Sequence, residues 1–403
     1  MLLKVITFNI WGLWLVSKKR KERVRLIGEH LEKADLDVVL LQEVFVRSDV
    51  QTLITLAGRG SLQHAQYFDS GYLGGELLIL SRYPITYTRY HRYTVSGSPI
   101  SVWEGDFYAA KGVAMACLAT PCGPLHVYNT HTNANYNHVF QHVDIAGGVE
   151  LPSDSNFPVR LVQFLELAYF IAAQSSQGDA PVILGGDLNC GPEDIEVVML
   201  RSLLPQLQDS WDTVHPDEPG CTSNYDLPGH VRKDPPKRID FLLSSLMPVS
   251  AEVVMDTAAA GMRLSDHLGL KTVFACNAAP SCKRFVVEPG LVSPIASHKP
   301  LFKLAEEKLS RGSKHWVLMA RTCAVVALAS CAPVLIASLA IEIWLAATDK
   351  STAGEIVMYV VAVLAAVLLP FLLAFSVAFQ GQASAMRVHA SGLQRVLKAS
   401  PSS

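Results

Sequence analysis

Short apolar runs of strand length recur along the first two thirds of the chain, and polar side chains stand at the ends of several of them. Residues 180–184 form the clearest run, because their length and composition fit a strand buried on both faces. The segment 185–189 follows directly and reads Gly-Gly-Asp-Leu-Asn. Asp187 and Asn189 are two residues apart, so their side chains point the same way at a strand's end. The pattern predicts either a polar site at the rim of a sheet or a polar turn after a core strand.

Three further apolar runs favour a polar site at the rim of a sheet over a simple turn. Asn9 ends an apolar run that begins at residue 5, and Glu43 stands near the end of the run 38–44. Asp266 and His267 immediately precede the run 268–274. Polar groups therefore border four predicted strands, in the order Asn, Glu, Asp-x-Asn and Asp-His.

These four blocks, in this order over about 275 residues, resemble the endonuclease/exonuclease/phosphatase superfamily of DNase I-like, Mg²⁺-dependent phosphodiesterases. The resemblance implies an α/β (α+β) fold, which is a DNase I-like four-layer sandwich of two packed mixed sheets flanked by helices. Predicted strands that alternate with predicted helices are compatible with this architecture.

The resemblance also assigns roles to individual residues. The metal ligands would be Asn9, Glu43 and Asp266. The substrate phosphate would be held by Asn189, with Lys111 either a second phosphate-binding group or a surface lysine. The catalytic residues would be Asp187, which orients or activates the attacking water, His267 as base or phosphate partner, Asp240, which holds that histidine, and His131 near the leaving group.

These residue types suit the chemistry. Mg²⁺ prefers oxygen ligands and is commonly held by one or two carboxylates together with substrate phosphate, and Glu43 and Asn9 offer such a sparse site. Mn²⁺ is the alternative ion. Histidine is the usual proton acceptor near neutral pH, and a neighbouring carboxylate can orient it. The chain contains no Gly-x-Ser-x-Gly, so a covalent serine mechanism has no support.

A closer resemblance, to neutral sphingomyelinases, covers nearly the whole chain. Residues 9–18 are similar to their N-terminal NxWGxxxxSK block, residues 70–75 to their SGxxGSG loop, and residues 106–113 to their D-x(4)-KGV segment. The chain departs from the family at Gly75-Glu76, where Ser-Gly is usual, and at residues 143–158, which look like an insertion.

This resemblance implies a phospholipase C reaction that converts sphingomyelin, or a related phosphosphingolipid, to ceramide and phosphocholine. The departures leave inositol-phosphorylceramide and lyso-phospholipids as alternative substrates. A nuclease or an inositol-phosphate phosphatase of the same fold is a further alternative, and a catalytically inactive scaffold is another. Residues 1–275 carry 22 Lys and Arg against 30 Asp and Glu. Since nucleic-acid binding requires a positive face, we expect no nucleic-acid partner.

The C-terminal third has a different composition. Hydrophobic residues make up 50% of the whole chain and the mean hydropathy is +0.26, with the excess near this end. Residues 322–345 and 356–379 are each long enough to cross the ~30 Å hydrocarbon core of a bilayer. They predict a two-helix transmembrane hairpin, with a buried hairpin in a soluble protein as the alternative. Lys and Arg flank the outer ends, so the positive-inside rule places those ends and the catalytic part in the cytosol.

We therefore divide the chain into a phosphodiesterase domain at 1–275, a linker and juxtamembrane segment at 276–315, and a membrane anchor at 316–403 that ends in a short cytosolic tail. The expected location is integral and multi-pass, in the endoplasmic reticulum, Golgi or plasma membrane. The expected partners are the bilayer and its lipid substrate, with anionic phospholipid as a further candidate.

Two stretches near the N-terminus allow two interpretations each. Residues 11–16 are either core residues under a loop or a lip that faces lipid, because Trp favours the membrane interface. The basic run 18–25 is either a solvated helix face or a contact with anionic lipid. His138 and His142, four residues apart, are better explained as surface histidines than as a metal pair.

Overall fold

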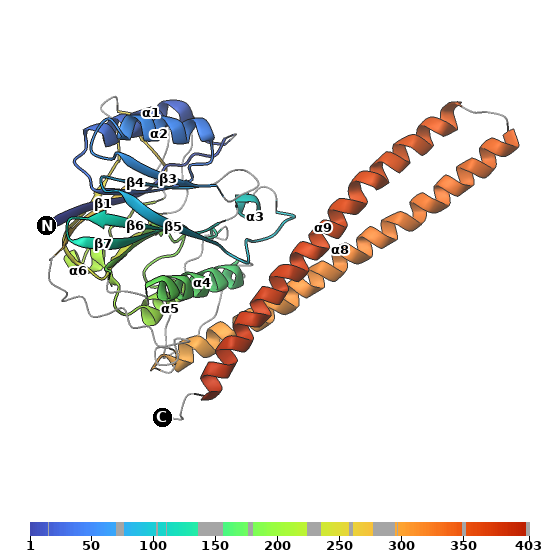
Figure 1. Cartoon of the computed structure of the whole chain (residues 1–403). Coiled ribbons are helices and arrows are strands. Elements are labelled where there is room, and N and C mark those ends of the chain that lie inside the picture. Colours follow the sequence, from blue (N-terminus) through green and yellow to red (C-terminus); the bar gives the residue numbers. More distant parts are fainter. Residues whose placement is uncertain are drawn as a thin grey trace.

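The computed structural model describes residues 1–14, 16–69, 76–101, 104–109, 111–135, 156–175, 180–223, 235–257, 261–276, 295, 297–348 and 352–399. Its body is a sandwich of two six-stranded sheets with helices on both outer faces, and two long helices project from it (Figure 1). The predicted sandwich of two mixed sheets flanked by helices is confirmed. The family-like loop at 70–75, residues 143–155 of the insertion, and His138 with His142 lie outside the described residues.

The first sheet contains the strands that carry Asn9 and Glu43. Its order is β11-β12-β1-β2-β4-β3, in which only β1 and β2 run parallel among the described pairs. All residues of β2 and of β4 are buried, because helices cover one face and the second sheet the other. The strands are β1 (Leu2–Asn9), β2 (Val38–Gln42), β3 (His64–Phe68), β4 (Leu77–Ser81), β11 (Met247–Val254) and β12 (Gly269–Ala275).

The second sheet contains the Gly-Gly-Asp strand at its centre. Its order is β5-β6-β7-β8-β10-β9, with β7 and β8 parallel. A side chain at Gly186 would place its Cβ 2.0 Å from the Thr130 carbonyl oxygen, so this strand pair requires glycine there. The strands are β5 (Ile85–Arg92), β6 (Gly112–Thr120), β7 (Gly123–His131), β8 (Val182–Asp187), β9 (Gln208–Asp209) and β10 (Asp240–Ser244).

Helices complete the four layers. Helices α1 (Arg20–Lys33) and α2 (Arg47–Ala57) cover the first sheet, while α4 (Phe157–Ser175) and α5 (Ile195–Leu203) cover the second on the opposite side (Figure 1). The short helices α3 (Asp106–Ala109) and α6 (Ser210–Val214) lie in connections. Apolar side chains fill the space between the sheets, among them Leu40, Ile79, Val127, Ile183 and Leu242.

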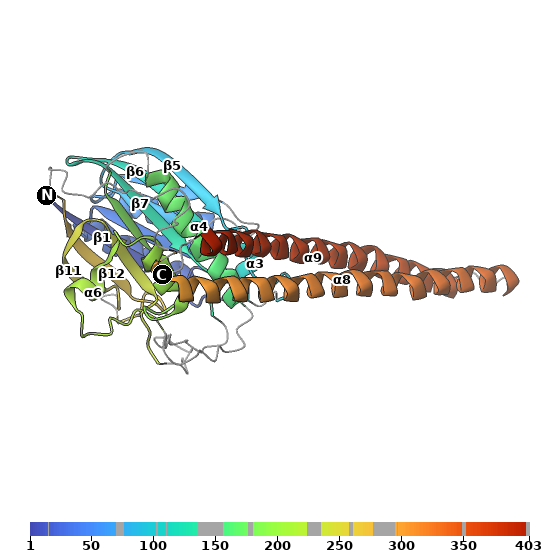
Figure 2. The ribbon, with the colours of Figure 1, turned by 90° about the horizontal axis from the view of Figure 1, so that it is seen from below.

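The two long helices, α8 (Lys299–Thr348) and α9 (Thr352–Ala399), lie side by side and project as a rod in both views (Figures 1 and 2). Their ends nearest the body pack on α4 and α5. The apolar side chains that join the core of the second sheet there include Phe302, Leu309, Trp316, Phe379, Met386 and Leu393. Farther out, large apolar side chains are exposed on both helices, including Leu328, Ile336, Leu339, Tyr359 and Val377.

Within the described residues, one helical segment is long and apolar enough to cross a membrane, Leu368–Lys398 in α9. Two spans were predicted, and a second one stays a prediction. The side chains of Phe379, Met386 and Leu393 in this segment are buried against the body. Most of the exposed large apolar side chains of this segment lie before Phe379, within the second predicted span, and Val388 is a further one beyond it. The three-part division of the chain also stays a prediction, and α8 already begins at Lys299 inside the predicted linker.

The rod leaves the body on a defined side. In both views the N-terminus, where β1 begins, lies on the side opposite to the rod (Figures 1 and 2). Strand β1 therefore runs from that side of the body toward the side from which the rod projects.

Candidate active site

The site forms where strand ends from both sheets meet. Parallel pairing of β7 with β8 sets His131 opposite Asp187, and antiparallel pairing of β10 with β8 sets Asp240 opposite the same aspartate. Across the sandwich, the Asn9 amide Nδ2 donates a hydrogen bond to Asp187 Oδ2 at 2.9 Å. This contact joins the two sheets at their polar rim.

Buried Asn9 and half-buried Glu43 lie in an oxygen-rich corner, and the charge of buried Asp266 acts on Glu43. Asn9 Nδ2 also donates to Glu43 Oε1 at 3.0 Å, whereas Glu43 Oε2 is buried without a hydrogen-bond partner. Burial, followed by the negative charge of Asp266, raises the pKa of Glu43 to about 7. A buried carboxylate oxygen without a donor, next to a second buried carboxylate, fits a site for a hard cation.

His267 is held by a carboxylate on one side and faces another. Its Nδ1 lies 2.9 Å from Asp240 Oδ2, which also accepts a 2.6 Å hydrogen bond from the Thr222 hydroxyl. Its Nε2 lies 3.8 Å from Asp187 Oδ2. Burial opposes the charged form of His267, but Asp240, Asp187 and Asp266 outweigh it and raise its pKa to about 10.

His131 belongs to a buried chain of ionisable groups. Its Nδ1 lies 2.8 Å from Glu76 Oε2, and its Nε2 lies 2.8 Å from Lys111 Nζ. Because the lysine ammonium can only donate, Nε2 accepts and the ring proton sits on Nδ1, where it bonds to Glu76. Burial, followed by the positive charge of Lys111, lowers the pKa of His131 to about 3, so this ring is neutral. Asp106 Oδ1 completes the chain, 3.0 Å from Lys111 Nζ.

Lys111 and Asn189 share one anchor, the carbonyl oxygen of Thr132. Lys111 Nζ donates to it at 2.8 Å and Asn189 Nδ2 at 2.9 Å. Asn189 has a positive φ of 50° and its backbone N–H donates to Asp187 Oδ1. The two groups predicted to hold phosphate are therefore oriented by the residue that follows β7.

The structure brings all nine predicted site residues into this group of strand ends, and their individual roles stay predictions. Among the described residues, three potential ligand atoms of Asp187, Asp240 and His267 lie within 4.8 Å of one another and could hold a metal ion. This set differs from the predicted ligands Asn9, Glu43 and Asp266. Asp240 Oδ2 already accepts two hydrogen bonds, and Mg²⁺ prefers oxygen ligands to imidazole. We therefore favour the oxygen-rich corner for a hard ion.

Sequence reasoning missed two residues of the site. Glu76 was noted only as a departure from a family motif, yet it is fully buried and bonded to His131. It precedes β4, and since β4 runs antiparallel to β2, its start lies beside the end of β2. A carboxylate before an apolar strand was the available signal. Thr222 stands in a loop-rich stretch that offers no comparable pattern.

The loop after β1 is held by one arginine, Arg23 on α1. Its guanidinium donates to the backbone carbonyls of Ile10 and Trp11 at 2.7 Å, of Leu264 at 2.8 Å and of Lys18 at 3.0 Å. Trp11 is buried under the guanidinium, whereas Trp14 is 70% exposed. The structure thus places Trp11 in the core and leaves Trp14 and Val16 exposed.

The basic run is also divided. Arg20 is buried in an ion pair with Asp49, and Arg23 is buried by its carbonyl contacts, whereas Lys19 and Lys21 are exposed. The run is therefore not a single solvated helix face.

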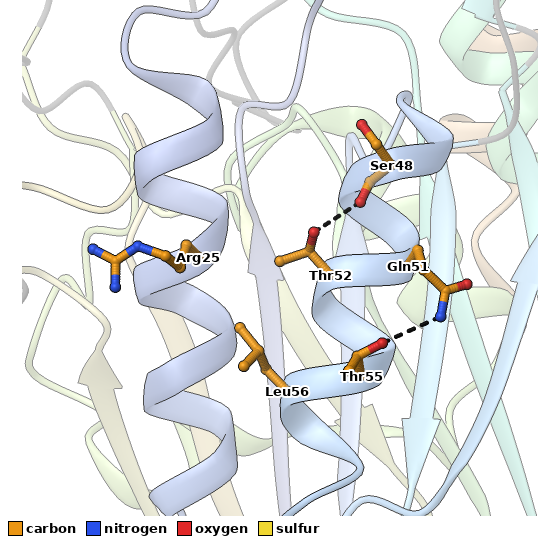
Figure 3. A pocket seen from close by; sticks show the side chains of 6 residues that line it. All are labelled: Arg25, Ser48, Gln51, Thr52, Thr55 and Leu56. Carbon is orange, nitrogen blue, oxygen red and sulfur yellow. Dashed lines mark hydrogen bonds between the residues drawn. The ribbon is translucent and has the colours of Figure 1, made fainter.

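A pocket of about 510 Å³ between α1 and α2 lies apart from this site (Figure 3). Its lining is Arg25, Ser48, Gln51, Thr52, Thr55 and Leu56. Thr52 donates to the Ser48 carbonyl and Gln51 to the Thr55 hydroxyl, so these polar groups are paired within α2. None of the site residues lines it.

Comparison with solved structures identifies the fold. The chain is similar to a humanized D. rerio TDP2 and to SmcL, each with a TM-score of 0.51 and 20% identity over 68% of this chain and 99% of the other. At this identity the likeness concerns the fold alone.

Comparison with curated proteins finds relatives at higher identity. The chain is 34% identical over 219 residues to the Schizosaccharomyces pombe protein named inositol phosphosphingolipids phospholipase C, covering 54% of this chain and 47% of that protein. It is 33% identical over 199 residues to human sphingomyelin phosphodiesterase 2 and to a putative neutral sphingomyelinase of Drosophila melanogaster. These two matches cover 49% of this chain and 44% and 41% of the relatives. The chain spans about half the length of the curated relatives it matches.

A family model identifies the body of the chain. The model of the Endonuclease/Exonuclease/phosphatase family matches residues 6–267, which is well over half of the chain. The matched region begins within β1 and ends at His267, so it contains all nine predicted site residues. The chain therefore belongs to the Endonuclease/Exonuclease/phosphatase family.

Proposed function

We propose that the chain is a membrane-anchored, Mg²⁺-dependent phospholipase C that hydrolyses sphingomyelin, or a related phosphosphingolipid, to ceramide and a phosphorylated headgroup. One observation carries the proposal. The strand ends gather a carboxylate and amide corner, an aspartate-held histidine and two phosphate-binding candidates around Asp187. The names of the curated relatives support the substrate class.

Asn9, Glu43 and Asp266 would hold the metal ion. When bound, a divalent ion polarises a phosphoryl oxygen and stabilises negative charge on the leaving oxygen. The fit rests on the buried, unpartnered Oε2 of Glu43 and on the absence of any basic side chain bonded to that oxygen in the described structure. Mn²⁺ satisfies the same oxygen donors and is the alternative ion.

The protein's own groups would carry out the proton and phosphate chemistry. Asp187 lies between Asn9, His131 and His267, so it can orient the attacking water through Oδ2, the oxygen that all three approach. His267, fixed by Asp240, carries a proton near neutral pH because its pKa is raised to about 10, so it can donate to a phosphoryl oxygen; only its neutral form could take the proton of that water. Asn189 would hold the phosphate from the Thr132 side, and Lys111, whose ammonium is bonded to His131, Thr132 and Asp106, would supply positive charge behind it, with neutral His131 beside the leaving group.

The arrangement of the rod supports a substrate within a membrane. The exposed apolar side chains of α8 and α9 need an apolar environment, and a bilayer provides it. Strand β1 ends toward the side from which the rod projects, so the site would face the surface of the same membrane (Figures 1 and 2). Anchoring then raises the effective concentration of the lipid at the site. We place the body in the cytosol, at the endoplasmic reticulum, Golgi or plasma membrane.

The decisive test is an assay of the purified full chain with Mg²⁺ on mixed micelles of sphingomyelin, inositol-phosphorylceramide and lyso-phosphatidylcholine. Asp187→Asn and the surface variant Gln51→Ala are measured in parallel. We expect chelator-sensitive release of phosphocholine from sphingomyelin by the wild type and by Gln51→Ala, and loss of release by Asp187→Asn.

The competing outcomes are distinct. Preference for inositol-phosphorylceramide would change the headgroup and keep the mechanism. Cleavage of plasmid DNA with no turnover of any lipid would contradict the proposal and indicate a nuclease.

A further inference from the structure

One side chain of helix α9 forms hydrogen bonds to a loop beside the site. Gln382 is buried, and its Oε1 accepts a 3.0 Å hydrogen bond from the Ser96 backbone N–H. Its Nε2 donates to the Gly97 carbonyl at 2.9 Å. A side-chain amide that satisfies one N–H and one C=O of the same loop fixes both its position and its orientation.

The loop that contains Gly97 packs on Asn133, the residue that follows Thr132. Gly97 has a φ of +92°, and a Cβ there would lie 2.8 Å from the side-chain amide of Asn133, so only glycine allows this approach. Gln163 on α4 ties the same two segments together. Its Oε1 accepts from the Asn133 N–H, and its Nε2 donates to Asn133 Oδ1 at 2.7 Å and to the Val95 carbonyl at 3.0 Å.

Asn133 is bonded directly to Thr132, whose carbonyl orients Lys111 and Asn189. A continuous path of buried contacts therefore runs from Gln382 through Gly97 and Asn133 to the two phosphate-binding candidates. No step of this path crosses solvent, since Ser96, Asn133 and Thr132 are all buried.

We infer that Gln382 is a positioning residue for the reaction, and that α9 is part of the catalytic unit rather than only its anchor. The inference rests on the proposed function for its chemistry. Loss of the Gln382 contacts lets the Thr132 carbonyl move, and Lys111 and Asn189 move with it. Small displacements of groups that hold the reacting phosphate reduce the rate strongly.

The test uses the full chain in detergent micelles, so that tethering to a bilayer does not enter. Gln382→Ala removes both hydrogen bonds, and Gln382→Glu keeps the shape and the acceptor but loses the donor to Gly97. Gly97→Ala disturbs the path from its other end. The matched control is Ser313→Ala, which removes the buried hydrogen bond from Ser313 to the Ala383 carbonyl, a contact between α8 and α9 that does not reach the loop.

Two readouts separate positioning from simple loss of stability. The first is kcat and KM for sphingomyelin with Mg²⁺, together with the thermal unfolding midpoint. We expect kcat to fall about tenfold in Gln382→Ala and in Gly97→Ala, and by less in Gln382→Glu. In Ser313→Ala we expect kcat to fall less than twofold, at a thermal unfolding midpoint similar to that of Gln382→Ala. The second is hydrogen exchange of the Thr132 and Asn133 amides, which donate to Asp187 O and Gln163 Oε1. Exchange of these two amides should be faster in Gln382→Ala and Gly97→Ala only.

Unchanged exchange at these amides in both Gln382→Ala and Gly97→Ala would overturn the inference, whatever the activities are. Faster exchange with unchanged kcat would overturn it as well, because the path would then not reach the chemistry. If the wild type hydrolyses none of the lipids, the proposed function fails, and the exchange measurement alone decides whether α9 orders the site.

Discussion

His267 Nδ1 lies 2.9 Å from Asp240 Oδ2, and a hydroxyl of Thr222 fixes the same oxygen from the other side. The aspartate therefore sets the orientation of the ring and holds a proton on Nδ1. It lies on β10, which pairs with the strand that carries Asp187, so the histidine is aimed at the centre of the site by two neighbouring strands.

The first prediction concerns this pair. Asp240→Asn keeps the volume of the side chain but removes the charge that orients His267, so we expect kcat to fall by roughly 10²–10⁴-fold. The measurement is initial velocity of phosphocholine release at saturating micellar sphingomyelin. Asp35→Asn is the matched control, because Asp35 is exposed and forms surface ion pairs with Lys4 and Arg82. A kcat for Asp240→Asn within threefold of the wild type would contradict the role.

The second prediction concerns the metal corner. Glu43→Gln keeps the acceptor for Asn9 Nδ2 but removes the negative charge, so the Mg²⁺ concentration for half-maximal activity should rise at least tenfold. The thermal stabilisation that Mg²⁺ gives the wild-type protein should shrink in parallel, since ligand binding stabilises the folded state. Glu252→Gln on the surface of β11 is the control. Equal Mg²⁺ dependence in Glu43→Gln and wild type would assign the ion elsewhere, with the Asp187, Asp240 and His267 set as the next candidate.

The third prediction concerns the exposed residues beside the site. Trp14 and Val16 are 70% and 64% exposed on a loop whose two ends, at Trp11 and Lys18, accept hydrogen bonds from Arg23. If they contact the bilayer, Trp14→Ala and Val16→Ser should lower activity on sphingomyelin vesicles about fivefold or more and leave activity on detergent micelles unchanged. Val249→Ser on β11 is the control, because Val249 is similarly exposed at 54%. Wild-type activity on vesicles in all three variants would show that the loop stays in water.

The fourth prediction concerns the junction of α4 and α9. Burial alone would raise the pKa of Glu166, but hydrogen bonds from His389, His91 and Thr94 outweigh it and lower the pKa to about 2. His389 lies on α9, 3.1 Å from Glu166 Oε1. A depressed carboxylate pKa contributes stability that is complete above the ordinary value of 4.5 and is lost as the pH falls toward 2. The contribution is roughly 3 kcal/mol.

The matching experiment compares thermal unfolding midpoints of wild type and Glu166→Gln in detergent between pH 2 and pH 7. We expect the wild type to be more stable at pH 5 and above, and the difference to close as the pH falls toward 2. Glu252→Gln serves again as the surface control, with little difference at any pH. A constant difference between wild type and Glu166→Gln across this range would show that the charge of Glu166 does not hold the junction.

Local sequence patterns were enough to predict several strands and the polar residues at their ends. Apolar runs of five to nine residues and short motifs are properties of contiguous residues, so Asn9, Glu43, Asp187 and His267 were identifiable one block at a time. The family resemblance placed these blocks in one site. The long apolar helices could be predicted as readily, because composition alone indicates them.

Which groups far apart in the sequence meet depends on how the elements pack. Glu76 reaches His131 across 55 residues because β4 runs antiparallel to β2, and strand direction is not encoded in the local pattern. Gln382 reaches Ser96 across 286 residues because α9 folds back onto α4, although its sequence resembles a simple anchor. Sheet order, the stacking of the two sheets and the docking of α9 depend on the packing of the whole chain. That packing gives the site its second carboxylate–histidine pair and joins it to the helix that projects from the body.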